Sequence, residues 1–422
     1  MRRRLLAAAL AGVLAPGLSP ARGQLTGEAV ADNATAYKQM SLEQLMNLDV
    51  TSVSREPERY AEAPAAIDVV TGDDIARSGA TSIPEALQLA DNLEVAQKTS
   101  HDWAISARGF DTALSNKLLV LMDGRTVYTP LFSGVFWDVQ DYLLADLDRI
   151  EVISGPGGSL WGANAVNGVI NITTKSAKDT QGGYLEAGGG SQLRDFFGAR
   201  YGAELAPDVF VRVYGKYFEQ DSEELSDGQP ANDNWRMRQG GFRLDSLAVA
   251  NTTLTLQGDI YDGLEHVTTG GEAAVDGGNV LGRWSRTFSP DADLSLQLYY
   301  DRTHLEDPIP ASAFARAGIL TDALDTYDLD FQDHFTLAGT NNILWGLGYR
   351  FTRDDVGNAP GLAFYPVRLD QKLLSAFLQD EIRLRPDLHL TVGSKIEHND
   401  YTGGELEPSA RLAWTPAQNQ TV

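Results

Sequence analysis

Beyond Lys175 the chain alternates residue by residue between apolar and polar side chains, and no other feature constrains its fold as tightly. The pattern is clearest in VFVRVYGKY (209–217), TLTLQGDIY (253–261), LSLQLY (294–299) and LHLTVGSKI (388–396). Because successive side chains of a strand point to opposite faces, each segment predicts a strand with one apolar and one polar face. We count about twelve strands of this kind.

The connections between these strands alternate in length. Short turns lie near Pro207, Pro290 and Pro386, whereas long polar loops cover residues 219–234, 262–278, 306–323, 353–370 and 398–407. Short turns on one side and long loops on the other are typical of an antiparallel barrel of the bacterial outer membrane. We therefore expect the apolar face to contact lipid and the long loops to lie outside the cell.

The N-terminus predicts export. Arg2, Arg3 and Arg4 precede the apolar run 5–14, and a small-x-small pattern ends at Gly23. A transmembrane helix needs about 20 apolar residues, so this run is too short to span a membrane. We interpret residues 1–23 as a secretory signal peptide that is cleaved from the mature protein.

Composition excludes several classes of function. Asp and Glu number 58 against 34 Lys and Arg, so a nucleic-acid backbone would be repelled. The absence of cysteine excludes disulfides, thiolate metal sites and cysteine nucleophiles. The six histidines show neither a metal-ligand spacing nor the Ser-His surroundings of a hydrolase. We expect no enzyme activity, no cofactor and no resident metal.

A glycine-rich turn between two apolar strands lies before the alternating region. It reads RIEVISGPGGSLWGANAVNGVINITTK over residues 149–175, and the segments AISARGF (104–110), NKLLVLMDGRTVY (116–128), APAAIDVVTGDDIARSG (63–79) and IPEALQLA (83–90) precede it. A nucleotide-binding loop is excluded, since no Lys-Ser or Lys-Thr pair closes the turn. In order and content, these pieces resemble the plug domain of TonB-dependent outer-membrane receptors. The resemblance covers roughly residues 60–175.

The resemblance implies a mixed α/β plug domain (60–175) followed by an all-β transmembrane antiparallel barrel, of which 176–422 would be part. A barrel that holds a plug needs about 22 strands, so about twelve cannot close around it. An unclosed sheet would leave strand edges unpaired in lipid. We therefore expect a 22-stranded barrel in the full protein, and we interpret the printed sequence as the N-terminal part of a longer receptor.

Receptors of this family take up scarce nutrient complexes with energy supplied through a periplasmic TonB-type protein. The resemblance favours an iron–siderophore complex; the alternatives are a corrinoid of the vitamin B12 type or, in another class, a passive porin-like channel. The TonB-type partner adds a strand to a short TonB box, which we place within the periplasmic segment 24–59 at Asp49, Val50, Thr51, Ser52, Val53 and Ser54. A short plug strand or linker is the alternative for these residues. We expect a monomer in contact with outer-membrane lipid.

Two sets of plug residues are candidates for contacts. The segment 128–138 is too apolar for an ordinary solvated loop, and plug apices face the outside in this family. We predict ligand contacts at His101, Asp102, Trp103, Phe132, Phe136 and Trp137, with packing against the barrel wall as the alternative. Many relatives carry Arg where this chain has Ser154, so Arg108 is our candidate for a plug-to-barrel ion pair.

Overall fold

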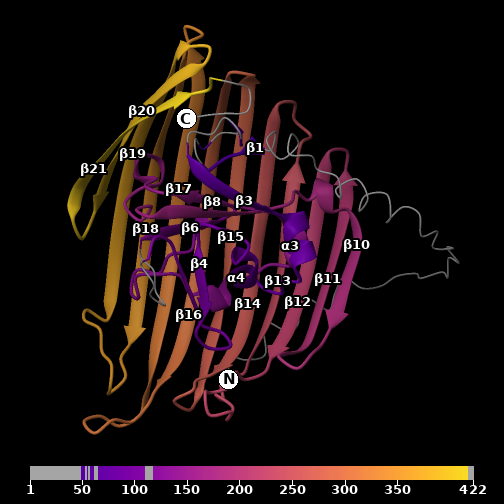
Figure 1. The fold of residues 1–422 in the computed structure, drawn as a ribbon, viewed down its shortest axis with the longest axis vertical. Helices are drawn as coiled ribbons and strands as arrows, with labels where there is room; N and C mark the ends of the chain where they lie inside the picture. The colour runs from indigo at the N-terminus through magenta and orange to yellow at the C-terminus, as the bar shows by residue number, and fades with distance from the viewer. Residues whose placement is uncertain (1–48, 53–54, 56–57, 61–64, 110–116, 417–422) are drawn as a thin grey trace, which may run out of the picture. The chain divides into compact units, whose positions relative to one another are not determined.

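The computed structural model describes residues 49–52, 55, 58–60, 65–109 and 117–416, and these residues form a small mixed plug and a 12-stranded antiparallel sheet (Figure 1). The predicted signal peptide lies outside the described residues, as do Val53 and Ser54 of the predicted TonB box. None of the described helices is long and apolar enough to cross a membrane.

The plug is built on a five-stranded sheet in the order β3-β8-β9-β6-β7, in which only the β6–β9 pair is parallel. Its strands are β3 (Ala66–Thr71), β6 (Leu118–Met122), β7 (Arg125–Thr126), β8 (Leu147–Ser154) and β9 (Gly168–Thr174). Two small hairpins pair β1 (Asp49–Val50) with β2 (Glu58–Arg59), and β4 (Glu94–Gln97) with β5 (Trp103–Ser106). The helical turns are α3 (Gly72–Ser78), α4 (Ile83–Leu87), η2 (Trp137–Val139), η3 (Leu144–Asp146), α5 (Gly158–Trp161) and η4 (Lys178–Thr180).

Local sequence explains where the plug elements begin and meet. Thr71 caps α3 and exchanges hydrogen bonds with Asp74, and α3 stops at Gly79, whose φ is 80°. The predicted closing strands are β8 and β9. They lie so close that a Cβ on Gly168 would be 2.3 Å from the carbonyl oxygen of Ile153, so only glycine fits there.

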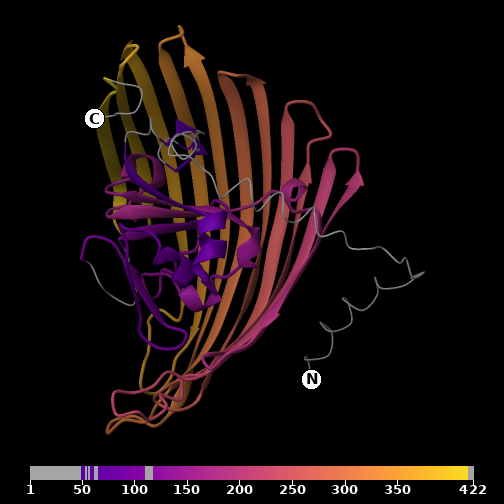
Figure 2. The same cartoon turned by 45° about the vertical axis from the view of Figure 1, so that its right-hand side comes forward.

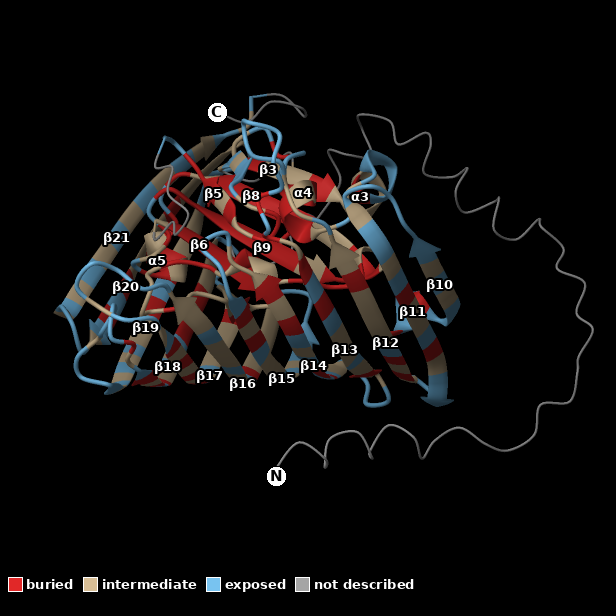
Figure 3. Cartoon of the chain, turned by 90° about the horizontal axis from the view of Figure 1, so that it is seen from below, coloured by how far each residue is buried: buried red, intermediate tan, exposed pale blue. Residues whose placement is uncertain are grey.

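The apolar core of the plug lies between its sheet and its helices. Ile150 and Val152 of β8 pack with Ile170 and Ile172 of β9 and with Leu87 of α4, and all five are almost fully buried. Figure 3 shows this concentration of buried residues along β8 and β9. Apolar side chains that leave water together give the plug its own stable core.

The large sheet contains the 12 strands that the alternating pattern predicts. They are β10 (Gly182–Gly188), β11 (Leu193–Ala206), β12 (Val209–Gln220), β13 (Trp235–Ser246), β14 (Thr252–His266), β15 (Glu272–Ser289), β16 (Ala292–Ile309), β17 (Gly318–Leu337), β18 (Asn341–Gly357), β19 (Arg368–Arg385), β20 (Leu388–Asn399) and β21 (Gly403–Trp414). Each strand pairs with the next, and β10 and β21 are the two edges. The sheet curves, and the plug lies against its concave side (Figure 2).

The strands extend further into the predicted long loops than the sequence indicated. The β14–β15 ladder continues to the pair His266 and Glu272, which leaves residues 267–271 as the connection instead of 262–278. Likewise, β16 runs to Ile309 and β18 to Gly357. Polar side chains ended our predicted strands, but backbone pairing does not depend on side-chain polarity and continues past them.

The two faces of the sheet have opposite character. In β14, Leu254, Leu256 and Ile260 are exposed on the convex face, while Gln257 and Asp259 are buried toward the plug. An apolar outside and a polar inside suit a sheet that meets lipid on one face and a polar plug on the other.

We expect residues 221–234 and 358–367 to lie outside the cell, and the turns at Pro207, Pro290 and Pro386 to face the periplasm. Single cysteines at these sites in the full-length receptor can be labelled on intact cells with a membrane-impermeant maleimide, since the printed sequence has no cysteine of its own. Loop cysteines should react at once, and turn cysteines only after lysis. Reaction at the three proline turns in intact cells would reverse the orientation.

Candidate functional site

The described part of the predicted TonB box is docked on the plug. Its strand β1 forms a two-residue hairpin with β2, in which Val50 pairs with Glu58. Val50 and Ser52 are both 0% exposed, and Val50 packs in a cluster with Leu119 and Val169 of the plug. This segment is therefore held in place through both its backbone and its side chains.

One buried carboxylate, that of Glu151 in β8, accounts for most of the polar contacts of this segment. It accepts the backbone N–H of Thr51 (3.1 Å) and of Ser52 (2.8 Å), and the Ser52 hydroxyl also donates to it. Arg149 Nε donates to the same carboxylate at 2.6 Å. A buried carboxyl group is costly unless donors surround it, and here the docked segment, residues 49–52, supplies three of those donors.

Two further plug side chains complete the dock. Trp161 Nε1 donates to the Ser52 carbonyl oxygen at 2.8 Å, and Asn171 Nδ2 donates to the Ser52 hydroxyl oxygen at 3.2 Å. The backbone N–H of Thr51 and both backbone groups of Ser52 are thus in use. A strand added by a partner needs free backbone groups, so the docked segment cannot offer these to a partner at the same time.

Arg55 connects the same segment to the large sheet. Its backbone φ is 62°, and its guanidinium carbon lies 4.3 Å from the ring centroid of Trp161 and 4.9 Å from that of Phe377. The guanidinium also pairs with Asp330 of β17 at 3.2 Å. Arg55 therefore joins the docked segment to the plug and the sheet through one charge and two aromatic faces.

The predicted ligand residues His101, Asp102 and Trp103 lie where the plug meets the long-loop end of the sheet. His101 Nε2 is 3.2 Å from the carbonyl oxygen of His266, and Ser100 donates its N–H to Asp233 at 2.8 Å. Asp102 is half-buried and lies 3.6 Å from Lys98. Trp103 is only 8% exposed and belongs to the plug core.

The three aromatic ligand candidates of segment 128–138 differ in their burial and in their contacts. The Phe132 ring centroid lies 5.3 Å from that of Phe136 and 5.9 Å from that of Phe364 in the β18–β19 connection. Phe132 and Phe136 are half-buried, whereas Trp137 is 6% exposed and belongs to the plug core. The structure thus brings Phe132 and Phe136 together and buries Trp137 in the plug core.

Arg108 lies in an exposed turn with a φ of 63°. A Cβ on Gly155, in the glycine-rich turn, would be 3.6 Å from its Nη2 atom. Within the described ranges, no carboxylate lies in ion-pair distance of Arg108. The plug-to-sheet ion pairs are made by other residues.

These ion pairs form a polar seam between plug and sheet. Asp146 pairs with Arg200 at 2.5 Å, Asp141 pairs with Lys216 at 2.5 Å, and Arg125 pairs with Asp301. Asp123 accepts the Thr174 N–H and the Gln257 amide, each at 2.8 Å. Burial opposes ionisation of Asp123, but nearby Arg243 and the donors from Thr174 and Gln257 hold the pKa of this carboxyl below its usual value.

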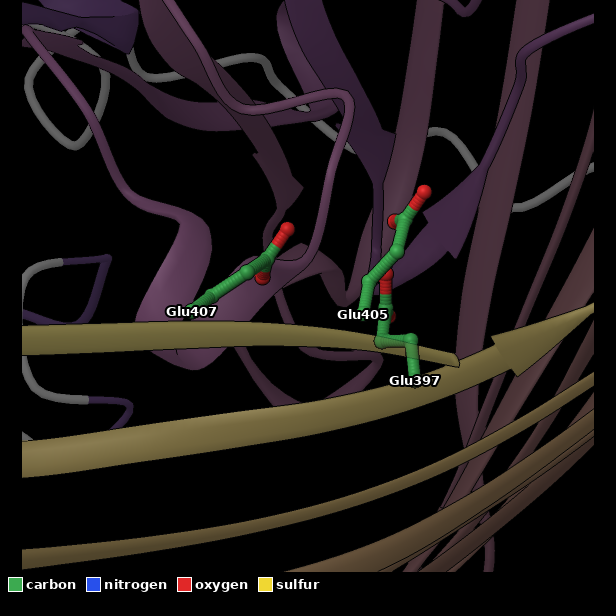
Figure 4. A group of neighbouring side chains, drawn as sticks. All are labelled: Glu397, Glu405 and Glu407. Atoms are coloured by element: carbon green, nitrogen blue, oxygen red, sulfur yellow. The ribbon is translucent and has the colours of Figure 1, made fainter. Parts of the chain in front are cut away.

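Three glutamates of the last two strands, Glu397, Glu405 and Glu407, lie close enough to share a cation (Figure 4), with carboxylate oxygens within 4.8 Å of one another. Glu397 already has a cationic partner, since Lys395 lies 2.9 Å away, and it accepts the Ala163 N–H at 3.1 Å. Together these contacts anchor the turn after α5 to β20.

Sequence reasoning missed Glu151 and Arg55. An acidic residue in the middle of the apolar run IEVI was the available signal for Glu151, because a buried acid must have partners. Arg55 gave no comparable signal, since its two aromatic neighbours lie more than 100 residues away in the chain.

A mixed plug seated on the polar, concave side of an antiparallel sheet with an apolar outer face defines a plug-and-barrel receptor of the outer membrane. Residues 59–169 match the family described as TonB-dependent Receptor Plug Domain, and residues 217–422 match TonB dependent receptor-like, beta-barrel. The chain belongs to the TonB-dependent receptor family, whose members lie in the outer membrane of Gram-negative bacteria.

Relatives and solved structures agree with this family. The vitamin B12 transporter of Vibrio vulnificus is 29% identical over 196 residues, which are 46% of this chain and 28% of that protein. The ferripyoverdine receptor of Pseudomonas aeruginosa superposes with a TM-score of 0.71 at 16% identity, over 87% of this chain and 57% of the other. The ferric enterobactin receptor of the same organism superposes with a TM-score of 0.70 at 18% identity, over 88% of this chain and 62% of the other. The chain spans less than two thirds of each of these proteins.

Trp137 is buried in the plug core and Phe132 is only half-buried, and this difference leads to a prediction. Trp137→Ala should destabilise the plug by about 3–5 kcal/mol, since it removes a large side chain from the core. Phe132→Ala, at a half-buried position, should leave the amount of folded receptor unchanged and weaken ligand binding by about 1–3 kcal/mol if the ring contacts the ligand. Heat unfolding and ligand titration of the full-length receptor measure the two effects separately. Equal unfolding temperatures for both variants would contradict the assigned depths.

Proposed function

We propose that this chain is part of a receptor that binds a scarce nutrient complex outside the cell and imports it with energy from a TonB-type periplasmic protein. An iron–siderophore complex is the proposed ligand, and a corrinoid is the alternative. The proposal rests on two features that occur together: the segment 49–52 docked on the plug, and the polar seam of ion pairs between the plug and the sheet. A passive channel needs neither. We propose no catalytic step.

The choice of ligand rests on the relatives. The solved structures that superpose on the chain include receptors for ferripyoverdine and ferric enterobactin, and the sequence relatives include vitamin B12 transporters. The apical aromatic residues Phe132 and Phe136 suit either ligand, because rings with few torsions bury an apolar face at little entropic cost. We propose that His101 and Asp102 border the same surface, and that Trp103 and Trp137 support it from below.

Uptake measurements test the transport class. Cells whose only receptor of this kind is the full-length protein should accumulate a labelled ferric siderophore or cyanocobalamin, and a protonophore should abolish accumulation while surface binding persists. Uptake that continues at the same rate with the protonophore would favour the porin-like channel.

We further propose that residues 49–54 are the TonB box. Val53→Pro removes a backbone donor that strand addition needs, so uptake should fall to background while ligand binding is retained. As a control, Val53→Ala keeps the backbone donor and should leave uptake unchanged. Normal uptake by Val53→Pro would place the box elsewhere.

Glu151 should control how readily this box leaves the plug. Glu151→Gln replaces a charged acceptor of several hydrogen bonds by a neutral amide, so amide exchange at Thr51 and Ser52 should accelerate roughly 10- to 100-fold. Binding of the TonB-type C-terminal domain should tighten in parallel. Asp148→Asn is the matched control, since Asp148 pairs with Arg149 but does not contact Thr51 or Ser52, the box residues whose hydrogen bonds the structure describes. Equal exchange in both variants would contradict the assignment of Glu151.

A further inference from the structure

The convex, lipid-facing side of the large sheet carries a groove across strands β15 to β18. These strands lie in the middle of the sheet, so neither edge of the sheet borders the groove (Figure 1). Its volume is about 520 Å³, and the apolar side chains Val280, Leu298 and Leu329 that line it are exposed. The plug lies against the other face of the sheet, so it does not fill this groove.

Differences in side-chain size produce the groove. A Cβ on Gly282 would meet no heavy atom of the described residues within 4 Å, so the sheet surface is open there. Tyr300, Tyr327 and Tyr349 also line the groove, and the ring centroids of Tyr300 and Tyr327 are 5.0 Å apart. Water would find few polar partners between these side chains, so a hydrocarbon chain occupies the groove at lower free energy than water does.

The groove lies at the level where the apolar band of the sheet ends. On β16 the outward-facing residues are apolar from Leu294 to Tyr300, and the next one is Arg302. The stretch from Asp291 to Tyr300 rises about 23 Å at a strand tilt of about 40°, which is close to the height of the apolar band of a membrane barrel. In the orientation proposed above, the groove therefore lies in the outer leaflet.

Two arginines follow the groove on its long-loop side. The strand register pairs Arg302 with Asp325, and Asp325 in turn with Arg353. Arg302 donates to Asp325 at 2.9 Å, and Arg353 donates to Asp370 of β19 at 2.9 and 3.2 Å. The two arginine side chains are 47% and 50% exposed, and a guanidinium has five N–H donors, more than these pairs use.

The spacing of the two arginines favours a ligand with two anionic groups. Arg302 and Arg353 are separated by one strand, which places their backbones about 10 Å apart. A guanidinium binds phosphate through charge-assisted and often bidentate hydrogen bonds. A membrane lipid with a single phosphate reaches one of these arginines, whereas a headgroup with a phosphate at each end reaches both.

We propose that this groove and its two arginines form a binding site for lipid A, the diphosphorylated glycolipid of the outer leaflet of Gram-negative outer membranes. One acyl chain lies in the groove beside Gly282, and the phosphates bind Arg302 and Arg353. The site is on the opposite face of the sheet from the plug, so it is separate from the contacts proposed for the nutrient and for the TonB-type partner.

Native mass spectrometry of the delipidated full-length receptor in detergent tests this site. Hexa-acylated lipid A is titrated, and dephosphorylated lipid A and phosphatidylglycerol are titrated in parallel. The wild type should bind one molecule of lipid A, with a dissociation constant at least about tenfold lower than that of either other lipid, because only lipid A engages both arginines.

Gly282→Leu tests the groove. The new side chain occupies the space of about two methylene groups of the acyl chain, so the dissociation constant for lipid A should rise about tenfold. Gly215→Leu is the matched control. Gly215 of β12 shares the lipid-facing side with the exposed Val213 and lies outside the groove, and a Cβ there would meet only the Gln239 carbonyl oxygen, at 4.0 Å. This variant should bind lipid A as the wild type does.

The double variant Arg302→Gln, Arg353→Gln tests the headgroup contacts without changing the groove. Its dissociation constant for lipid A should rise about 10- to 100-fold, since hydrogen bonds between charged groups are lost. Arg238→Gln is the control, because Arg238 of β13 is also exposed and paired with an aspartate, Asp262, but lies away from the groove. Heat unfolding of each variant verifies that it is folded.

Several outcomes would overturn the proposal. Unchanged lipid A binding in Gly282→Leu is one, and an equal loss of binding in Gly215→Leu is another. Unchanged binding in the double arginine variant, or phosphatidylglycerol that binds the wild type as tightly as lipid A, would rule out a site for two phosphates. A wild-type dimer that Gly282→Leu converts to a monomer would assign the groove to a second copy of the receptor.

Discussion

The requirement that every strand backbone group be paired in lipid determines the rest of this structure. It produces the continuous antiparallel ladder from β10 to β21, in which each strand is hydrogen-bonded to the next. Lipid on the convex face selects apolar side chains such as Leu254 and Ile260, so the alternating residues must point inward. Because those inward residues are polar, the plug must meet the sheet through hydrogen bonds and ion pairs.

A polar seam behaves differently from an apolar one. Separating Asp146 from Arg200, or Asp141 from Lys216, leaves charges that water can solvate, so part of the lost interaction is recovered. Apolar contacts have no such compensation. The plug can therefore hold a stable fold through its own core while its seat in the sheet stays adjustable.

The sequence predicted the parts that depend on local pattern. Period-two alternation predicted about twelve strands, of which the sheet contains 12, and the glycine-rich turn between apolar runs predicted the β8–β9 pair. Strand ends were predicted too short, because ladders such as β14–β15 continue through polar residues. Depth could not be predicted: Trp137 and Phe132 belong to one short apolar segment, yet only the contacts of the folded plug place Trp137 in the core and Phe132 against Phe364.

Glu151 shows how one buried carboxylate holds the described part of the predicted TonB box on the plug. It accepts hydrogen bonds from Thr51, Ser52 and Arg149, so a donor that leaves it without replacement exposes an unpaired buried oxygen. The neighbouring residues Ile150 and Val152 point to the opposite face of the same strand and belong to the apolar plug core. Loss of the polar contacts at Glu151 therefore need not disturb that core, because the two sets of contacts lie on different faces of β8.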